Sequence, residues 1–272
     1  MKVLIVYAHP EPLSLNGSLK NSAVRILQEN GHEVVVSDLY QMQWKAAADE
    51  NDFSSYTPGN RLFYSREARE ALANGTLSAA VMTEQEKIRW ADTILFVFPL
   101  WWFSMPAIMK GWVDRVFSAG FAYGIKQRYG IGNLSGKKVM LMVTTGGMEE
   151  NYLEKGGING SMSDLLFHIH HGICWFTGAA SLPPFVVYSA DRLTEDKYPA
   201  VETALEERLL TMDTTPVLPF RYSNSGDYDE KDVLLPHLAA GKQGFALHLR
   251  EELPLQEMID TDTAAAIDEQ RK

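Results

Sequence analysis

The segment that most constrains this chain is Thr93–Gly111, which reads TILFVFPLWWFSMPAIMKG. Its apolar first part, Thr93–Phe98, has the length of a buried strand, and we expect a helix to begin near Pro106. Between them lies the aromatic run Trp101–Phe103. Ligands of parallel α/β sheets bind at the C-terminal ends of the strands. Three bulky rings at such an end therefore indicate a flat, apolar partner, although they also suit a core or a dimer interface.

Composition restricts the classes of function open to these 272 residues. The net charge of −10 argues against a nucleic-acid partner, because phosphate binding requires clustered lysine and arginine. The longest clean apolar run, Thr93–Phe103, is too short to span a bilayer, and the N-terminus lacks a secretory cleavage pattern. The single cysteine, Cys174, excludes an intrachain disulfide. We therefore expect a cytoplasmic protein with no transmembrane segment.

Apolar stretches of strand length alternate with helical patterns along most of the chain. The expected strands are Lys2–Ala8, Glu33–Asp38, Thr93–Phe98, Lys138–Thr144 and Ala180–Tyr188. This alternation predicts right-handed βαβ units and a parallel sheet. Because a ligand-type loop follows the first strand at once, we predict an α/β fold with a flavodoxin-like, doubly wound sheet of five strands in the order 2-1-3-4-5.

Three details of this prediction are less regular. Pro183-Pro184 interrupts the fifth strand and favours an edge position. Thr83 and Glu86 form a capping-box pattern that predicts a helix start at Thr83. Several prolines and little periodicity after residue 213 predict a flavin-binding domain at 1–213 and an irregular extension at 214–272, packed on the core or on a dimer partner.

The polar loop His9–Asn16 follows the first expected strand and precedes a helix. Helix N-termini bind phosphate, and Ser14 and Asn16 can donate or accept hydrogen bonds there, although both residues are also common caps. The loop carries neither G-x-G-x-x-G nor G-x-x-x-x-G-K-[ST], which disfavours ordinary dinucleotide and P-loop sites. The third loop, Thr144–Gly147, allows close backbone approach to a ligand or forms a simple turn.

Two tyrosines, Tyr123 and Tyr152, are candidate hydrogen-bond donors to a developing anion, and Asn159 offers a neutral donor. By themselves, tyrosines are more often half-buried surface residues. The histidines at 168, 170 and 171 suggest a metal, but no acidic cluster completes a ligand set, so we predict no metal site.

Together these segments resemble the NAD(P)H:quinone oxidoreductases of the DT-diaphorase type, a flavodoxin-like family. The resemblance covers residues 2 to about 212 and is carried by LIVYAHPEPLSLN at 4–16, VVVSDLY at 34–40, FPLWWFSMPAIMKGWVDRVF at 98–117, FAY at 121–123 and TTGG at 144–147. The long tryptophan-containing match is specific, whereas TTGG is not. The overall length resembles that of the longer FAD-binding members rather than the short FMN flavodoxins.

The resemblance implies a homodimer with its active sites at the interface. It implies that FAD is held by His9, Ser14, Leu15, Asn16, Leu100, Trp101, Trp102, Phe103, Thr144, Thr145, Gly146, Gly147 and Tyr152. The substrate pocket would comprise Trp102, Phe103, Tyr123, Ile125 and Phe176, with Tyr123 and Phe176 contributed by the second subunit. Tyr152 and Asn159 would be the catalytic pair. NADH or NADPH would pass a hydride to flavin N5, and a quinone would then take it from the same place in a ping-pong cycle.

Two positions depart from the family pattern. Asn159 stands where the family has a histidine that stabilises the reduced ring, and asparagine cannot carry a proton. Ile125 replaces a pocket tyrosine, which makes the acceptor side more apolar. The resemblance favours an NAD(P)H dehydrogenase (quinone). Alternatives are an azo- or nitro-compound reductase and a flavin-binding ancillary subunit of a potassium efflux system.

Overall fold

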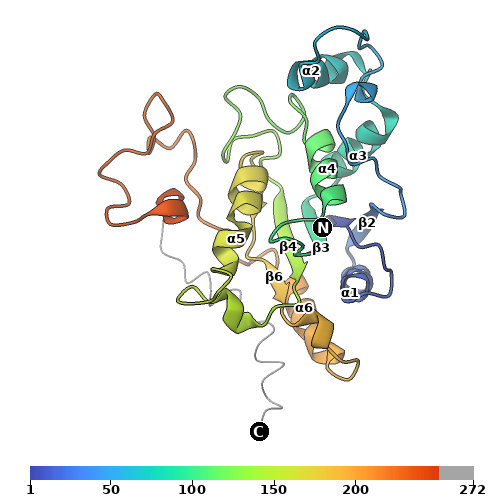
Figure 1. Ribbon diagram of the computed structural model, residues 1–272, viewed down its shortest axis with the longest axis vertical. Coiled ribbons are helices and arrows are strands. Elements are labelled where there is room, and N and C mark those ends of the chain that lie inside the picture. Colours follow the sequence, from blue (N-terminus) through green and yellow to red (C-terminus); the bar gives the residue numbers. More distant parts are fainter. Residues whose placement is uncertain (251–272) are drawn as a thin grey trace.

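The fold is built on one parallel sheet with helices on both faces (Figure 1). The computed structural model describes residues 1–250, so the last part of the predicted extension, 251–272, lies outside the described residues. The strands are β1 (Lys2–Tyr7), β2 (Glu33–Asp38), β3 (Thr93–Pro99), β4 (Lys138–Thr144), β5 (Ala180–Ser181) and β6 (Phe185–Val187). Their order is β2-β1-β3-β4-β5, with β6 also paired to β4, which confirms the predicted topology.

The predicted fifth strand is divided into two short pieces. Pro183-Pro184 separates β5 from β6, because proline has no N–H to donate to the neighbouring strand. Both pieces pair in parallel with β4, through Lys138↔Ala180 and Val143↔Val186. The edge therefore continues past the prolines, and β6 brings its own C-terminal loop to the end of β4.

The helices cover two faces of the sheet. Their bounds are α1 (Leu15–Glu29), α2 (Tyr64–Asn74), α3 (Ala79–Trp90), α4 (Ala107–Val116), α5 (Met162–Ile169) and α6 (Tyr198–Leu210), with the short helices η1 (Glu50–Asp52), η2 (Glu149–Tyr152), η3 (His170–Trp175, a π-helix), η4 (Ala190–Arg192) and η5 (Gly244–His248). Helices α1 and α6 pack on one face, where alternate residues of β1 join one apolar cluster. Helices α3, α4 and α5 cover the other face. No helix among residues 1–250 is long and apolar enough to cross a membrane.

Helix α3 begins earlier than its capping-box pattern predicts. The N-cap is Ser78 rather than Thr83, which lies inside the helix. Val81 is buried in the apolar cluster, and its burial stabilises the additional first turn. Tertiary packing thus outweighs the local capping signal, as is usual for amphipathic helices.

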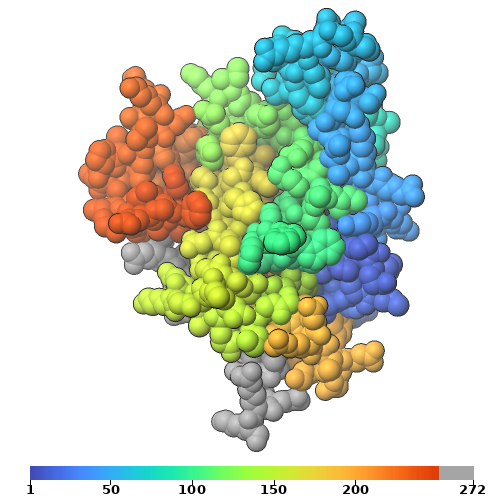
Figure 2. All heavy atoms as spheres, in the orientation of Figure 1, coloured from blue at the N-terminus to red at the C-terminus, as the bar shows by residue number. Residues whose placement is uncertain are grey.

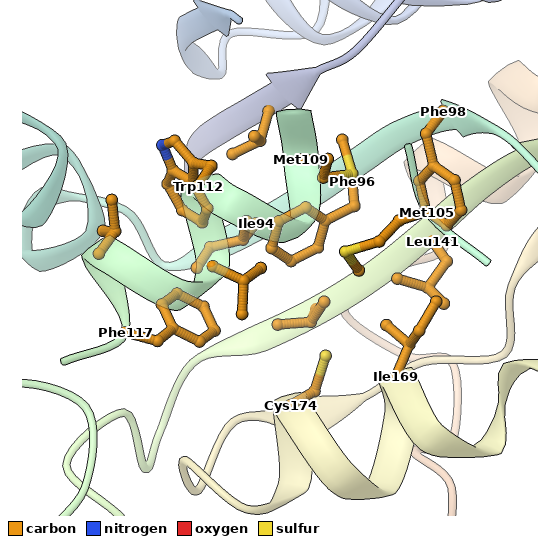
Figure 3. Packing of buried hydrophobic residues seen from close by; sticks show 14 of the residues in the cluster. Ile94, Phe96, Phe98, Met105, Met109, Trp112, Phe117, Leu141, Ile169 and Cys174 are labelled. Carbon is orange, nitrogen blue, oxygen red and sulfur yellow. The ribbon is translucent and has the colours of Figure 1, made fainter. Parts of the chain in front are cut away.

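The larger apolar cluster lies between β3, β4 and the helices α4 and α5 (Figure 3). Phe96 and Trp112 are fully buried and meet edge to face, with ring centroids 5.8 Å apart. Each such side chain contributes about 1.5–3 kcal/mol through burial. This packing fixes α4 against β3 and so fixes the loop between them, which contains the tryptophan run.

The chain segment between β2 and α3 has no clear periodicity in the sequence. One buried ion pair connects it to α4: Arg115 Nη2 lies 2.6 Å from Asp52 Oδ1. Tyr64 Oη of α2 donates to the other carboxylate oxygen, 2.8 Å away. The guanidinium also stacks over Trp44. Breaking such a buried pair costs about 3–5 kcal/mol, because a charge is left without its partner.

Residues 214–250, here called the tail, lie beside α5 and η3 (Figures 1 and 2). Leu218 and Phe220 bury themselves against Trp175 of η3. Trp175 Nε1 donates to the carbonyl of Arg221 at 2.9 Å. The described part of the tail therefore packs on its own core, whereas the division of the chain at residue 213 remains our prediction.

Candidate active site at the sheet edge

A pocket of about 380 Å³ opens at the C-terminal edge of the sheet. We call it the sheet-edge pocket. It is lined by His9, Ser14, Leu15, Asn16, Pro99, Leu100, Trp101, Thr144, Thr145, Gly146, Ala190 and Asp191. These residues come from the loops that follow β1, β3, β4 and β6, so strand ends that are far apart in sequence form one cleft. Its position is that of ligand sites in doubly wound sheets.

The first loop presents the N-terminus of α1 to this pocket. Ser14 is the N-cap, and its side chain accepts a hydrogen bond from Gly17 N at 3.2 Å. A Cβ on Gly17 would lie 2.0 Å from the carbonyl oxygen of Pro12, so the loop closes only over glycine. The free N–H groups and positive dipole end of the helix favour an anionic ligand. Capping and ligand binding are thus compatible at this position.

Asn16 has a buried amide at the base of the pocket. Its Oδ1 accepts a hydrogen bond from Thr144 Oγ1 at 2.7 Å. Its Nδ2 is buried and has no hydrogen-bond partner among the described residues. An unpaired buried donor costs about 1–3 kcal/mol. Asn16 therefore points to a polar acceptor that a bound molecule would supply.

The tryptophan loop is held in an unusual backbone conformation. Trp102 and Phe103 have φ values of +51° and +60°, which are rare for bulky residues. Trp102 is 95% exposed, and neither residue is among those that line the sheet-edge pocket. Trp101 lines it, with its ring 5.7 Å from that of His9. A strained loop that exposes aromatic rings is therefore a candidate functional surface.

The threonine–glycine loop contains a pair of hydrogen-bonded hydroxyls. Tyr152 Oη and Thr145 Oγ1 lie 2.7 Å apart, and Gly147 N donates to the same threonine oxygen at 3.3 Å. Tyr152 is 4% exposed, so its phenol reaches the pocket through Thr145 rather than directly. A Cβ on Gly147 would meet the tyrosine ring at 2.8 Å. Glycine is thus required here by close packing, which a simple turn would not need.

Asp191 is a pocket residue that the sequence interpretation missed. Ala190 N donates to the carbonyl of Thr145 at 2.9 Å, which brings the loop after β6 against the threonine–glycine loop. The carboxylate of Asp191 lies beside Gly146, where a Cβ would be only 2.5 Å from Oδ2. The signal was present in the sequence, since the fifth predicted strand ends at the same sheet edge as the others.

The predicted acceptor-side residues lie elsewhere in the chain. Tyr123 and Phe176 pack together with ring centroids 5.1 Å apart, and Ile125 is 75% exposed. None of the three is among the residues that line the sheet-edge pocket. Asn159 is half-buried, its backbone N–H bonded to Asn151 O at 2.9 Å, and it does not line the pocket either. Within one chain, the predicted acceptor-side residues and Asn159 are therefore separate from the sheet-edge pocket.

The three histidines near α5 have separate surroundings. His168 Nε2 lies 3.0 Å from Ser104 Oγ and so connects α5 to the tryptophan loop. His170 is buried, and His171 stacks on Phe167. Among residues 1–250, no group of three or more histidine, cysteine, aspartate or glutamate side chains could hold a metal ion.

Comparison with known proteins settles the family. Residues 1–209 match the model of a family described by its flavodoxin-like fold. The chain is 39% identical over 212 residues to the NAD(P)H dehydrogenase [quinone] 1 of Rattus norvegicus, covering 78% of this chain and 77% of the relative. The chain belongs to the flavodoxin-like NAD(P)H:quinone oxidoreductases. This confirms the resemblance on which the sequence interpretation relied, and it places the chain in an enzyme family.

Two members of this family match nearly the whole chain. A ribosyldihydronicotinamide dehydrogenase-like protein of Penicillium crustosum is 44% identical over 263 residues, covering 93% of this chain and 97% of the relative. A solved structure from Klebsiella pneumoniae, assigned to the quinone reductases, is 49% identical with a TM-score of 0.86. It covers 92% of this chain and 99% of its own. Both likenesses extend beyond residue 209 into the tail.

Proposed function

We propose that this protein is a cytoplasmic, homodimeric FAD enzyme that reduces quinones by two electrons with NADH or NADPH. The observation that carries the proposal is the sheet-edge pocket, in which a helix N-terminus, an unpaired buried amide on Asn16 and two glycine-closed loops converge. Family membership supplies the reaction class, and these groups supply a reason for a phosphate-bearing planar cofactor.

The residues present fit FAD in two respects. His9, Ser14, Leu15 and Asn16 at the start of α1 would hold the pyrophosphate, because they surround a positive helix end. Leu100, Trp101, Trp102, Phe103 and the loop 144–147 would hold the ring, because Leu100 and Trp101 line the same pocket as Thr144, Thr145 and Gly146. When bound, FAD supplies the two-electron exchange between a nicotinamide and a quinone.

Tyr152 and Thr145 have a defined part in this proposal. Thr145 Oγ1 accepts a hydrogen bond from Gly147 N and is hydrogen-bonded to Tyr152 Oη. One of the two hydroxyl hydrogens is used between them, so the other can point toward the pocket. Such a donor would stabilise negative charge that develops at that end of the ring. Asn159 would add a neutral hydrogen bond.

The acceptor side of the proposed site needs a second copy of the chain. Tyr123, Ile125 and Phe176 lie outside the sheet-edge pocket of their own chain, and we propose that they cover the open face of the cofactor in a homodimer. Exposed Trp102 and Phe103 would lie at that interface. One shared face would let the donor and then the quinone bind in turn, which is a ping-pong cycle.

The direct test is an absorbance spectrum of the purified protein, with identification of the released flavin as FAD or FMN. Steady-state rates with NADH, NADPH and a ribosyldihydronicotinamide donor against menadione should then give parallel double-reciprocal lines. A colourless protein that stays colourless after FAD is added, and that oxidises none of the donors, would refute the proposal. A yellow protein without turnover would instead favour the ancillary-subunit alternative, and preferred turnover of azo or nitro compounds would change the acceptor class.

Substitution of Tyr152 tests the hydroxyl pair. Tyr152→Phe keeps the buried ring but removes the hydroxyl that meets Thr145, so we expect kcat to fall about 10-fold or more, within the range for a lost catalytic hydrogen bond. The matched control is Tyr198→Phe, since Tyr198 Oη pairs with Ser22 on the opposite face of the sheet. Equal rate losses in the two variants would contradict the proposed part of Tyr152.

A further inference from the structure

A second cavity of about 260 Å³ lies between the tail and η3. We call it the tail cavity. Tyr129, His171, Tyr228 and His248 form its walls, Ser223 lies at its side, and it shares no lining residue with the sheet-edge pocket. A cavity of about 150 Å³ is enough to admit benzene. The tail cavity therefore has room for one ring with small substituents.

Flat side chains enclose this cavity. The His171 ring lies 5.1 Å from that of Tyr129, at an interplanar angle of 30°. It also lies 5.1 Å from the ring of His248, which in turn is nearly parallel to Tyr228 at 17°. These rings line the cavity, and aromatic and imidazole surfaces favour a planar ligand that packs against them.

The charges around the cavity balance. Arg128 is paired with Asp232, Nη2 to Oδ2, at 2.9 Å. Burial, and then the charge of His248, lower the pKa of His171 to about 4. Burial and the nearby Arg221 also lower the pKa of His248. Both imidazoles are therefore neutral at pH 7, and the cavity favours an uncharged ligand.

One imidazole offers unused hydrogen-bonding capacity. His248 Nδ1 lies 3.2 Å from the hydroxyl of Tyr228, whereas the ring nitrogens of His171 have no hydrogen bond to any residue in 1–250. A neutral imidazole presents one N–H donor and one bare nitrogen acceptor. The bare nitrogen suits an O–H group, and the flat walls suit the ring that carries it.

The tail cavity adjoins the proposed acceptor face. Tyr129 packs edge to face on Phe176 with centroids 5.2 Å apart, and Phe176 packs on Tyr123. Tyr129 also has a φ of +50°, a strained conformation for an aromatic residue. Ser223 secures this arrangement, because its N–H donates to Tyr129 O at 3.1 Å and its hydroxyl to Arg128 O at 2.8 Å. The strain is therefore maintained by the tail and marks a functional position.

We propose that the tail cavity is a second binding site, specific for an uncharged phenolic ring. Phenols include hydroquinones, the class of product that quinone reduction releases, so this choice of physiological ligand rests on the function proposed above. The site itself rests on the cavity, its neutral walls and the imidazole of His171, which has no hydrogen-bond partner among residues 1–250.

The test is a ligand-observed NMR titration of the FAD-loaded full chain with phenol, in the absence of any electron donor. For a ligand of this size we expect a Kd on the order of 1 mM. Benzoate, which has a similar shape but is charged, and toluene, which lacks the hydroxyl, should each bind about 10-fold more weakly. Equal binding of the three compounds would overturn the proposal.

Two variants locate the phenol. His171→Phe keeps a ring in the wall but removes both nitrogens, so phenol should bind about 10-fold more weakly while the KM for menadione stays within about twofold. Ser223→Phe should fill the cavity from a surface turn and abolish the same binding. His237→Phe, at an exposed position of the tail, is the control. Unchanged phenol affinity in both cavity variants, or complete displacement of phenol by menadione, would refute the site.

The outcomes separate the two proposals. If the protein binds phenol through His171 but oxidises no donor, the tail-cavity proposal stands and the quinone reductase proposal fails. If the protein is an active quinone reductase but does not bind phenol, only the tail-cavity proposal fails.

Discussion

The sheet-edge pocket and the tail are built in different ways. Backbone hydrogen bonds at the strand ends hold the pocket, such as Leu100 N to Thr144 O at 2.8 Å and Thr145 N to Val187 O at 2.9 Å. Within the tail, segments distant in sequence are connected by side chains as well as by backbone, above all by Arg221, whose Nε donates to Leu247 O at 3.0 Å. Backbone hydrogen bonds tolerate most side-chain substitutions, whereas a hydrogen bond from a side chain depends on one residue and on its charge. We therefore expect single substitutions to disturb the tail more readily than most positions of the pocket.

The largest effect should come from Gly17, which follows the pocket residue Asn16 and meets the backbone of Pro12. Gly17→Ala would place a Cβ 2.0 Å from Pro12 O, so the first loop must move away from α1. We expect flavin affinity to fall about 100-fold, equivalent to about 3 kcal/mol, with hydrogen exchange in residues 214–250 unchanged. The control is Gly172→Ala, where a Cβ would meet nothing within 4 Å. Flavin affinity in Gly17→Ala within twofold of the wild type would contradict this structure of the loop.

At acidic pH, the contact between η3 and the tail should unfold locally before the sheet does. Burial, followed by nearby His168, lowers the pKa of His170 to about 3, and burial lowers that of His171 to about 4, from an ordinary 6.5. Unfolding therefore takes up protons below pH 6.5, so this stability is complete above 6.5 and is lost as the pH falls toward 4 and then 3. Hydrogen exchange, corrected for its intrinsic pH dependence, should accelerate around η3 and the tail first. Simultaneous opening of β1 and β3 would show that the two regions are not independent.

Removal of the Arg221 hydrogen bonds should loosen the tail alone. Arg221→Met keeps the length of the side chain but loses the bond to Leu247 and the ion pair to Asp227 Oδ2 at 2.8 Å. We expect amide exchange in the tail to rise about 30-fold, equivalent to about 2 kcal/mol of local stability, with flavin affinity within twofold of the wild type. Arg250→Met is the control, because Arg250 lies 3.8 Å from the same carboxylate and is largely exposed. A large loss of flavin affinity in Arg221→Met would mean that the tail supports the pocket.

The smallest effect concerns a buried imidazole beneath the tail. His170 has two ring nitrogens without a hydrogen-bond partner among the described residues, next to a cavity of about 30 Å³. His170→Leu removes these polar atoms, so thermal unfolding should show a gain of about 1 kcal/mol. A loss of stability would instead indicate a bound water that the imidazole holds in the small cavity.

Much of the fold follows from local pattern. Strand β4 has its predicted bounds, because buried parallel strands are short continuous apolar runs. The partly buried edge strand β2 also has its predicted bounds. The meeting of the loops after β1, β3 and β4 also follows, since parallel strands end at one edge. The interruption at Pro183-Pro184 also follows, because proline cannot donate to a neighbouring strand. The start of α3 did not follow, because packing of Val81 decides it.

By itself, the sequence determined the topology, the edge that carries the pocket and the residues of its first three loops, because hydrophobic periodicity is local and the connections of βαβ units follow general rules. Only the tertiary structure decided that Asp191 joins this pocket, that Tyr152 Oη is hydrogen-bonded to Thr145 Oγ1, and that Tyr129 and His171 line a second cavity with the tail. These are contacts between side chains distant in sequence. Their geometry depends on how whole elements pack, which no local pattern records.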